Sequence, residues 1–303
     1  MKKYQIYGVG AALVDTEVVV SDAFLKKNGI EKGVMTLVDE LRQAELLDAF
    51  TADQHHLMKK SGGSACNTVV AAASLGAKAF FSGKVAADDD GEHFVEDLAE
   101  SGVAFHAASP EVGVTGKCLV MVTDDAERTM NTYLGASEQL TGREIDEAAL
   151  VESEWLYIEG YLLTDETRAA LIRDVVAKAK ESGVKVALSL SDPFVAQIFA
   201  DNLRAVIGEG VDLVFCNKDE ALAFTQTETV GEACDALKQN AKTFAVTDGA
   251  QGAIIFDGKD TVSVPGVPAD AVDTNGAGDM FAGAFMYALT AGRDFKWAAE
   301  LAN

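Results

Sequence analysis

Residues 155–216 read WLYIEGYLLTDETRAALIRDVVAKAKESGVKVALSLSDPFVAQIFADNLRAVIGEGVDLVFC. The stretch contains three short apolar runs: WLYIE at 155–159, KVALSL at 185–190 and VDLVFC at 211–216. Short apolar runs between turn residues predict buried strands, and the two longer spacers predict helices over Asp165–Ser182 and Pro193–Ile207. Strands that alternate with helices in this way are typical of an α/β fold, with a mainly parallel sheet covered on both faces.

The same alternation extends over most of the chain. Further strands are expected at Gln5–Val9, Ala79–Val85 and Thr243–Thr247, and further helices at Asp39–Phe50, Ser61–Gly76, Gly91–Ser101, Lys218–Phe224 and Gly276–Thr290. We therefore expect a three-layer α/β/α architecture in one domain, residues 1–303. The last residues, FKWAAELAN, follow a helical pattern without a stop signal, so we expect the natural chain to continue beyond Asn303.

Two segments, about 13–38 and 112–135, interrupt this alternation. The first contains the β-branched run LVDTEVVV, and the second contains two strand-like runs around the polar turn DDAER, which predicts a hairpin. No helix separates the paired runs of the hairpin. We expect the two segments to form a small separate sheet, a lid, inserted into the domain.

Composition narrows the possible functions. The chain has 48 acidic and 25 basic residues and a net charge of −23, which disfavours nucleic acid as a partner because phosphates must be neutralised by cationic residues. The start, MKKYQIYGVG, turns polar too early for a signal peptide, and no apolar run reaches spanning length. The four cysteines and four histidines lack the spacing of a zinc site, so we expect reduced, buried thiols and a cytoplasmic location, with no membrane partner.

The motif that carries chemistry is DTNGAGD at Asp273–Asp279, followed at once by the apolar helix MFAGAFMYAL. Small residues before a helix let backbone N–H groups surround an anion, and the helix dipole favours negative charge there. Asp279 falls in the first turn, where a carboxylate can accept a hydroxyl proton during phosphoryl transfer. The alternative is a glycine-rich turn in which Asp279 is only an acidic residue of the first helical turn, without a catalytic role.

DTNGAGD resembles the anion-hole motif of ribokinase-like (PfkB) kinases, and three other motifs of that family follow the same order. NKDE at Asn217–Glu220 resembles its NxxE motif, TDGAQG at Thr247–Gly252 its TxGxxG turn, and Gly62-Gly63 with Asn67 its amino-terminal glycine pair. The resemblance covers essentially the whole chain. It implies a ribokinase-like fold and an ATP-dependent kinase that uses Mg²⁺.

Several site residues follow from this resemblance alone. Asp279 is implied as the catalytic base, with an anion hole at Gly276, Ala277 and Gly278. The residues implied on the nucleotide side are Asn217, Glu220, Thr247, Gly249, Gly252 and Asn275. Glu220 is also implied to hold Mg²⁺, through water.

A second set of stretches resembles the adenosine-kinase branch of this family: DTEVVVSDAFLKKNGIEKG, TGKCLVMVTDDAERTMNTYLGAS, YIEGYLLT and LSLSDPF. The resemblance implies acceptor contacts from Leu13, Asp15, Gly62, Gly63, Ser64, Asn67, Tyr133, Tyr161 and Phe194, and a contact of Arg128 with the transferring phosphoryl group. Asp15 and Asn67 would bind vicinal ribose hydroxyls, and the two aromatic residues Tyr161 and Phe194 would line a nucleobase slot. The alternatives are a solvent-exposed strand aspartate, a helix-surface asparagine, core aromatics and a solvated turn arginine.

The chain departs from the branch at two places. Ala11-Ala12 stands where adenosine kinases have Asn-Pro, and Ala86 stands where the family's GxxGxD turn has its second glycine. The first departure leaves open which base, if any, is bound. The nearby acidic run Asp88-Asp89-Asp90 does not have the spacing of a calcium loop, and we expect a solvated turn before a helix.

The sequence thus predicts transfer of the γ-phosphate of ATP to a primary hydroxyl of an adenosine-like nucleoside. The alternative acceptor is a free sugar such as ribose, fructose or a keto-deoxy sugar acid. A dinucleotide-binding oxidoreductase is disfavoured because no GxGxxG follows the first strand, and the aspartate at 279 disfavours a non-catalytic binding protein. The oligomeric state is expected to be a monomer or a homodimer.

Overall fold

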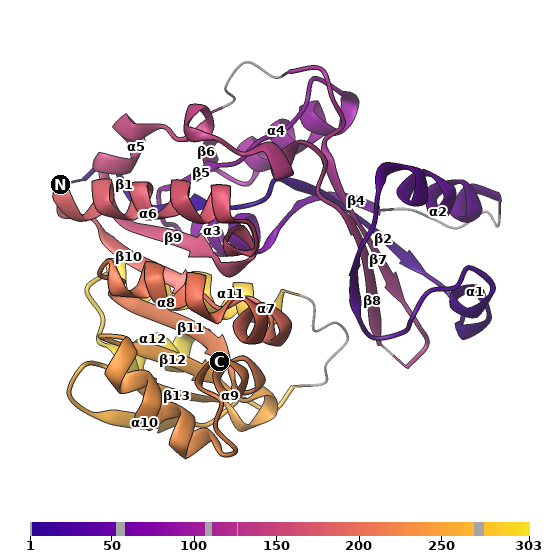
Figure 1. Cartoon of the computed structure of the whole chain (residues 1–303). Helices are drawn as coiled ribbons and strands as arrows, with labels where there is room; N and C mark the ends of the chain where they lie inside the picture. Colours follow the sequence, from indigo (N-terminus) through magenta and orange to yellow (C-terminus); the bar gives the residue numbers. More distant parts are fainter. Residues whose placement is uncertain (1, 53–57, 107–110, 126, 270–275) are drawn as a thin grey trace.

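The computed structural model describes residues 2–52, 58–106, 111–125, 127–269 and 276–303. A large body contains one twisted sheet with helices on both faces, and a smaller second sheet projects from one side of it (Figure 1). We refer to the second sheet, with its two helices, as the lid. The predicted α/β architecture with a small additional sheet is confirmed.

The body sheet has the strand order β14-β13-β12-β11-β10-β9-β1-β5-β6. Its strands are β1 (Tyr4–Val9), β5 (Ala79–Ser82), β6 (Val103–Phe105), β9 (Ser153–Glu159), β10 (Lys185–Ser189), β11 (Leu213–Asn217), β12 (Phe244–Thr247), β13 (Ala253–Phe256) and β14 (Thr261–Val264). All neighbours from β12 to β6 are parallel, and only the β12–β13–β14 edge is antiparallel. Parallel strands buried on both faces explain why the sequence shows continuous apolar runs there.

Helices cover the two faces of this sheet through two separate apolar clusters. One face carries α5 (Glu147–Val151), α6 (Glu166–Glu181), α7 (Pro193–Ile198), α8 (Ala200–Gly208), α9 (Lys218–Thr225) and α10 (Val230–Asn240). The other carries α3 (Ser64–Ser74), α4 (Asp89–Glu100), α11 (Ala277–Thr290) and α12 (Phe295–Ala302). Four 3₁₀ turns complete the body: Gly135–Gln139, Gly142–Glu144, Gly160–Thr164 and Gly249–Gln251. The predicted three layers are therefore present.

The lid sheet has the order β3-β8-β7-β2-β4. Its elements are β2 (Leu13–Val19), α1 (Asp22–Lys27), β3 (Met35–Leu37), α2 (Glu40–Ala52), β4 (Met58–Gly62), β7 (Gly116–Val122) and β8 (Arg128–Tyr133). The helices cover one face through a cluster that includes Phe24, Leu46, Phe50 and Leu119. The hairpin β7–β8 was predicted, whereas β4 was not, because MKKSG contains a single large apolar residue.

The structure differs from three further sequence expectations. The helix expected over Pro193–Ile207 is interrupted at Phe199, whose backbone (φ −105°, ψ 24°) is not helical, so α7 and α8 are separate. α10 was not predicted. Arg128, expected in the hairpin turn, is the first residue of β8.

The acidic run before α4 is not the solvated turn that we expected. Asp88 is the N-cap of α4, and its carboxylate accepts hydrogen bonds from Gly91 N and Thr115 N, both at 2.9 Å. Asp90 is 8% exposed and pairs with Lys59 of β4 and Lys117 of β7 at 2.7 and 2.5 Å. This run therefore joins the body to the lid.

Two expectations about composition can be compared with the structure. All four cysteines are free and buried, as predicted. Among the described residues, no helix combines the length and the apolar character that a membrane crossing requires.

Candidate active site

Asp279 lies in the first turn of α11, where the chain enters the helix through Gly276 in a left-handed conformation (φ 68°). Its two carboxylate oxygens accept hydrogen bonds from α3: Ser64 Oγ donates to Oδ1 at 2.7 Å and Asn67 Nδ2 donates to Oδ2 at 3.0 Å. Burial raises the pKa of Asp279 to about 6, although both hydrogen bonds oppose this shift. The first-turn N–H groups of a helix have no intrahelical acceptors, so this end of α11 suits an anion.

The glycine pair at the end of β4 lets two segments approach closely. A Cβ on Gly62 would lie 2.2 Å from the carboxyl carbon of Asp15, and a Cβ on Gly63 would lie 2.2 Å from the Ala11 carbonyl oxygen. Gly63 also has φ 97°, a conformation that other residues rarely adopt. Glycine at both positions therefore brings the Asp15 carboxylate next to the start of α3.

Asp15 lies on β2 of the lid, yet the charge of a body residue affects the pKa of its carboxylate. Its pKa is raised to about 7, mainly by burial and next by the negative charge of Asp279, while the Arg128 guanidinium acts in the opposite direction. Two carboxylates with raised pKa values thus approach each other from the lid and from the body. Paired groups of this kind are found at functional sites more often than elsewhere.

Glu159, at the carboxyl end of β9, is a site residue that the sequence interpretation missed. It is 1% exposed, and its carboxylate accepts hydrogen bonds from Ala11 N at 2.7 Å and Ala65 N at 2.9 Å. Burial raises its pKa to about 7. The side chain therefore holds the β1–β2 connection against the start of α3. A charged residue that ends an apolar strand, as in WLYIEG, was the available signal.

On the other side of the site, Asn217 and Glu220 form a capping box at the start of α9. Glu220 N donates to Asn217 Oδ1 at 2.8 Å, while Glu220 accepts from Asn217 N at 3.0 Å and from Asn217 Nδ2 at 2.7 Å. Burial raises the pKa of Glu220 to about 7. The NxxE spacing thus has a local structural reason in addition to its implied role.

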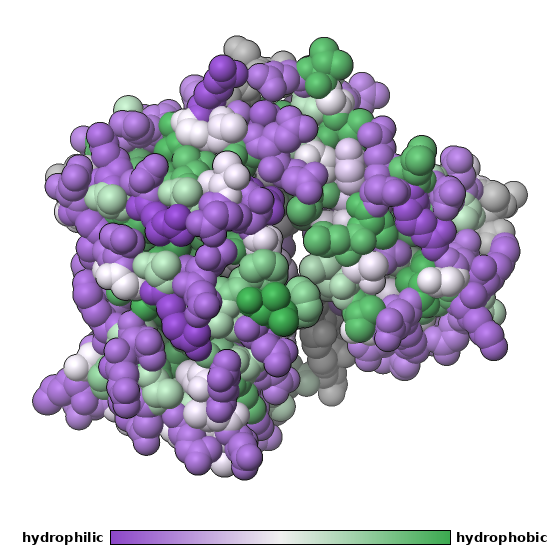
Figure 2. All heavy atoms as spheres, viewed as in Figure 1, coloured by the Kyte–Doolittle hydropathy of each residue, from purple (hydrophilic) through white to green (hydrophobic). Residues whose placement is uncertain are grey.

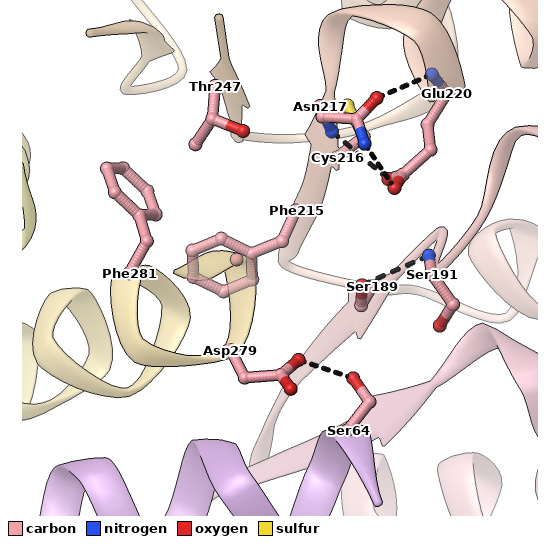
Figure 3. Close-up of a pocket in the computed structure, with 11 residues that line it drawn as sticks. Ser64, Ser189, Ser191, Phe215, Cys216, Asn217, Glu220, Thr247, Asp279 and Phe281 are labelled. Carbon is pink, nitrogen blue, oxygen red and sulfur yellow. Dashed lines mark hydrogen bonds between the residues drawn. The ribbon is translucent and has the colours of Figure 1, made fainter. Parts of the chain in front are cut away.

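A cavity connects the two sides (Figure 3). Its lining includes Ser64 and Asp279 at one end, Asn217, Glu220 and Thr247 at the other, and Ser189, Ser191, Phe215, Cys216, Gly278 and Phe281. Figure 3 shows the carboxylate of Asp279 pointing into the space below the Asn217–Glu220 pair. Residues from α3, α9 and α11, together with the ends of β10, β11 and β12, therefore meet at one edge of the sheet, where open α/β sheets bind ligands.

The turn after Thr247 contains two glycines in a left-handed or related conformation. Gly249 and Gly252 have φ values of 50° and 95°, and a Cβ on Gly252 would lie 2.1 Å from the Val264 carbonyl oxygen. The backbone is therefore bare of side chains at these two positions. Asn275, also expected on the nucleotide side, lies outside the described residues.

The remaining predicted positions are Leu13, Tyr161, Phe194, Arg128 and Tyr133. Figure 2 shows hydrophobic residues on both sides of the hollow between the body and the lid. Leu13 is buried in a small lid cluster with Ala11, Cys118 and Val120. Tyr161 is partly buried near the acids of the site, and its pKa is raised first by burial and then by the charges of Asp192, Glu220 and Asp279.

The other three predicted side chains are arranged differently. Phe194 on α7 is 63% exposed. The Arg128 guanidinium is nearly buried and lies 3.8 Å from Glu17 Oε2. Tyr133 Oη donates to Glu40 Oε2 at 3.4 Å, so its hydroxyl interacts within the lid.

Comparison with known proteins connects this geometry to a family. Residues 37–303 match the pfkB family carbohydrate kinase model. This chain is a PfkB-family kinase. It is a phosphotransferase with an alcohol group as acceptor, as expected.

The relatives of this PfkB kinase include proteins named as adenosine kinases and one named as a probable sugar kinase. The chain is 31% identical to adenosine kinase of Saccharomyces cerevisiae, over 97% of this chain and 91% of the relative. It superposes on the structure of adenosine kinase from Sinorhizobium meliloti with TM-score 0.91 and 37% identity, covering 99% and 92% of the two chains. A probable sugar kinase from Rhizobium etli gives TM-score 0.92 and 34% identity, covering 100% and 91%.

Magnesium accompanies ATP in most kinases, and one carboxylate of the cavity suits it. Among the described residues, no group of three or more His, Cys, Asp or Glu side chains is arranged to hold a metal ion. Magnesium bound with nucleotide phosphates keeps several waters and needs only one or two carboxylates. The single buried Glu220, whose pKa is also raised by the neighbouring charges of Asp192, Asp279 and Asp219, therefore fits a hydrated Mg²⁺ rather than an all-protein cage.

Proposed function

We propose that this PfkB-family enzyme transfers the γ-phosphate of ATP to the primary hydroxyl of an adenosine-like nucleoside. The observation that carries the proposal is the position of Asp279. Its carboxylate lies between Asp15 on the acceptor side and a cavity that extends to Asn217, Glu220 and Thr247 on the nucleotide side. A base in that position can reach an acceptor hydroxyl while the phosphates occupy the cavity.

Asp279 accepts the proton of the primary hydroxyl as the new oxygen–phosphorus bond forms and the bond to the leaving ADP oxygen breaks. Ser64 and Asn67 hold the carboxylate in one orientation by donating to different oxygens. The N–H groups at Gly276, Ala277 and Gly278, with the helix dipole, stabilise the charge that develops on the phosphoryl oxygens. Arg128 adds positive charge on the lid side, and lid closure excludes water that would otherwise hydrolyse ATP.

Magnesium, when bound beside Glu220, would neutralise charge on the nucleotide phosphates. Asn217 and Glu220 orient each other through the capping box, so both side chains are held in place before the nucleotide binds. Gly249 leaves the backbone open to the nucleotide, and Thr247, Gly252 and Asn275 are assigned to the same side by the family motifs.

A nucleoside is the preferred acceptor. Asp15 and Asn67, with the backbone of Gly62 and Gly63, would bind the sugar hydroxyls, and Tyr161 and Phe194 would flank the base. The exposed ring of Phe194 supports this reading, because a flat base would cover apolar surface that a free sugar leaves in contact with water. Relatives named as adenosine kinases add support. A free-sugar acceptor is the second candidate, favoured by Ala11-Ala12 and by the relative named as a probable sugar kinase.

The test is a comparison of kcat/KM for adenosine, inosine, ribose and fructose with the wild-type protein and Mg·ATP. We expect adenosine to have the highest value. If either free sugar exceeds both nucleosides, the nucleoside assignment is wrong and the sugar-kinase assignment replaces it. Tyr161→Ala gives a second criterion: with a nucleoside substrate the acceptor KM should rise about tenfold or more while the KM for ATP changes little.

Three further expectations accompany this function. The enzyme should act in the cytoplasm, where ATP and small-molecule acceptors are available, and should require no nucleic acid or membrane partner. Its oligomeric state should be a monomer or a homodimer. Size-exclusion chromatography with light scattering would distinguish these two states.

A further inference from the structure

The connection between β10 and α7 contains an unusual turn. Ser191 has φ 71°, and Asp192 N donates to the Leu190 carbonyl oxygen at 2.9 Å, which closes a three-residue γ-turn around Ser191. γ-turns with a positive φ at the central residue are rare and strained. Such a conformation in a residue other than glycine is maintained only when the surroundings enforce it, and it is found most often at functional sites.

The surroundings fix the Ser191 hydroxyl as well as its backbone. Gly160 N donates to Ser191 Oγ at 2.7 Å, and Ser191 N donates to Ser189 Oγ at 3.1 Å. A Cβ on Gly160 would lie 2.7 Å from the Ser189 carbonyl oxygen, so the ends of β9 and β10 are in close contact. The oxygen of the hydroxyl is therefore held by a backbone donor that does not compete for its proton.

Among the described residues, the proton of this hydroxyl has no protein acceptor. Across the part of the chain that the structure describes, no oxygen accepts a hydrogen bond from Ser191 Oγ. The neighbouring Ser189 differs, because its side chain also interacts with the hydroxyl of Tyr157. A hydroxyl whose oxygen is fixed and whose proton is available is a ready hydrogen-bond donor to a ligand.

The location of Ser191 indicates which ligand atom it meets. Ser191 lines the same cavity as Asp279 and Glu220, and Figure 3 shows it on the wall between the Asp279–Ser64 pair and the Asn217–Glu220 pair. On the proposed function, the acceptor hydroxyl lies at the first pair and the nucleotide phosphates lie near the second. The group that passes between them is the transferring phosphoryl group.

We propose that the Ser191 hydroxyl donates a hydrogen bond to a non-bridging oxygen of the phosphoryl group during transfer. This proposal rests on the proposed function and adds a contact to it. The acceptor oxygen bonds to phosphorus, the bond to the ADP oxygen breaks and the acceptor proton goes to Asp279, while Ser191 keeps its own proton. A fixed donor stabilises negative charge without reorganisation during the reaction, and the strained turn is what fixes it.

Two variants separate the hydroxyl from the turn. Ser191→Ala removes the hydroxyl, and Ser191→Gly removes it while supplying a residue that adopts φ 71° without strain. We expect both to lower kcat about ten- to a hundredfold, with the KM for the acceptor changed less than threefold. Ser191→Gly should keep a melting temperature at or near that of the wild type. The matched control is Gln226→Gly, since Gln226 is exposed, has φ 58° and lies at the C-terminus of α9; its kcat should stay at the wild-type value.

A sulfur-substituted nucleotide tests the contact itself, because sulfur accepts hydrogen bonds poorly. The wild type should react more slowly with ATPγS than with ATP. The ratio of the ATP rate to the ATPγS rate should be at least threefold smaller in Ser191→Gly than in the wild type. A purely structural role would leave this ratio unchanged. An unchanged ratio, or a kcat in both variants within threefold of the wild type, would overturn the proposal while leaving the kinase function intact. Absence of phosphoryl transfer by the wild type on every acceptor would overturn both.

Discussion

The body and the lid bury their sheets differently. The body sheet is covered by helices on both faces, and each face has its own large apolar cluster. The lid sheet is covered by α1 and α2 on one face, through the cluster around Phe24 and Phe50. Because successive side chains of a strand point to opposite faces, Leu13 and Asp15 lie together on the other face of the lid sheet. There the Asp15 carboxylate interacts electrostatically with Asp279 of the body. Among the described residues, helices thus cover both faces of the body sheet but one face of the lid sheet.

Polar contacts join the body and the lid, in addition to the packing of Val14 of β2 in an apolar cluster of the body. Asp90 of α4 pairs with a lysine on each of two lid strands, and Asp97 of the same helix accepts a hydrogen bond from Ser61 N at 2.6 Å. Polar links can re-form in a new position without exposing a core. On the proposed function, the body carries the catalytic base and the lid adds Asp15 to acceptor recognition, and the following predictions test this division.

The largest effect is expected for the body residue Asp279. Asp279→Asn keeps the shape of the side chain and removes the base, so kcat should fall roughly 10²–10⁴-fold. Binding of a non-hydrolysable ATP analogue, measured by calorimetry, and the melting temperature should stay near wild-type values. A variant that keeps more than half of the wild-type kcat would contradict the assignment of this carboxylate as the base.

The second prediction concerns the pH dependence of the unfolding free energy, which we expect to come mainly from buried carboxyl groups of the body. Burial raises the pKa values of Glu159 and Glu220 to about 7 and that of Asp279 to about 6, and of Asp15 in the lid to about 7. The unfolded carboxyls titrate near pH 4, so the folded state retains protons that the unfolded chain has lost. Stability from this source is present below about pH 4 and is lost as pH rises through 6–7.

The free energy of unfolding should therefore be lower at pH 8 than at pH 5.5, by about 2 kcal/mol for each carboxyl that titrates near pH 7 in the folded state. Urea denaturation at the two pH values measures this difference. Glu159→Gln should reduce it, since that carboxyl is 1% exposed and burial is the largest cause of its raised pKa. An unfolding free energy that rises between the two pH values would show that these carboxyls do not retain their protons in the folded state.

The third prediction moves to the lid. Asp15→Asn should raise the acceptor KM about ten- to a hundredfold, because hydrogen bonds to a charged group contribute about 1.5–3 kcal/mol each. The KM for ATP should change little. Asp22→Asn is the matched control, since Asp22 lies in the same lid on α1 and its side chain is 75% exposed. An equal loss in kcat with no change in the acceptor KM would remove the proposed division between lid and body.

The fourth prediction returns to the body. Glu220→Gln should raise the Mg²⁺ concentration for half-maximal activity about tenfold and lower kcat, without changing the acceptor KM. Asp219→Asn, one residue away and exposed, should behave as the wild type. A Mg²⁺ titration of Glu220→Gln that superposes on the wild-type curve would assign Glu220 to the capping box alone.

The smallest effect is expected where the two regions are joined. Asp90→Asn removes the charge that holds Lys59 and Lys117, and it should raise the acceptor KM about three- to tenfold while leaving the KM for ATP unchanged. The rate of ATP hydrolysis without acceptor should rise, because a loosely held lid excludes water less well. Asp89→Asn, at the exposed neighbouring position, is the control, and equal acceptor KM values for the two variants would contradict this role for Asp90.

Local sequence signals predicted the elements whose causes are local. Apolar runs located β9, β10 and β11, and the small residues of the glycine-rich motif indicated a helix start with Asp279 in its first turn. Motif order was enough to indicate the family. Signals failed where the cause is distant: β4 is a strand because it pairs with β2, although MKKSG has no strand-like pattern. The break at Phe199 between α7 and α8 could not be predicted either, because no glycine or proline stands there.

The proposed chemistry could be predicted largely from the sequence, because the motif DTNGAGD brings small residues and an aspartate together within seven consecutive residues. Tertiary structure decided which distant groups surround that aspartate. Ser64 and Asn67 donate to it across more than two hundred residues of chain, and Glu159 was brought to the start of α3 by the parallel sheet. The raised pKa values of the site carboxyls and the low exposure of Asp90 both arise from burial. Burial depends on the packing of segments that are distant in the sequence, so no local pattern can encode it.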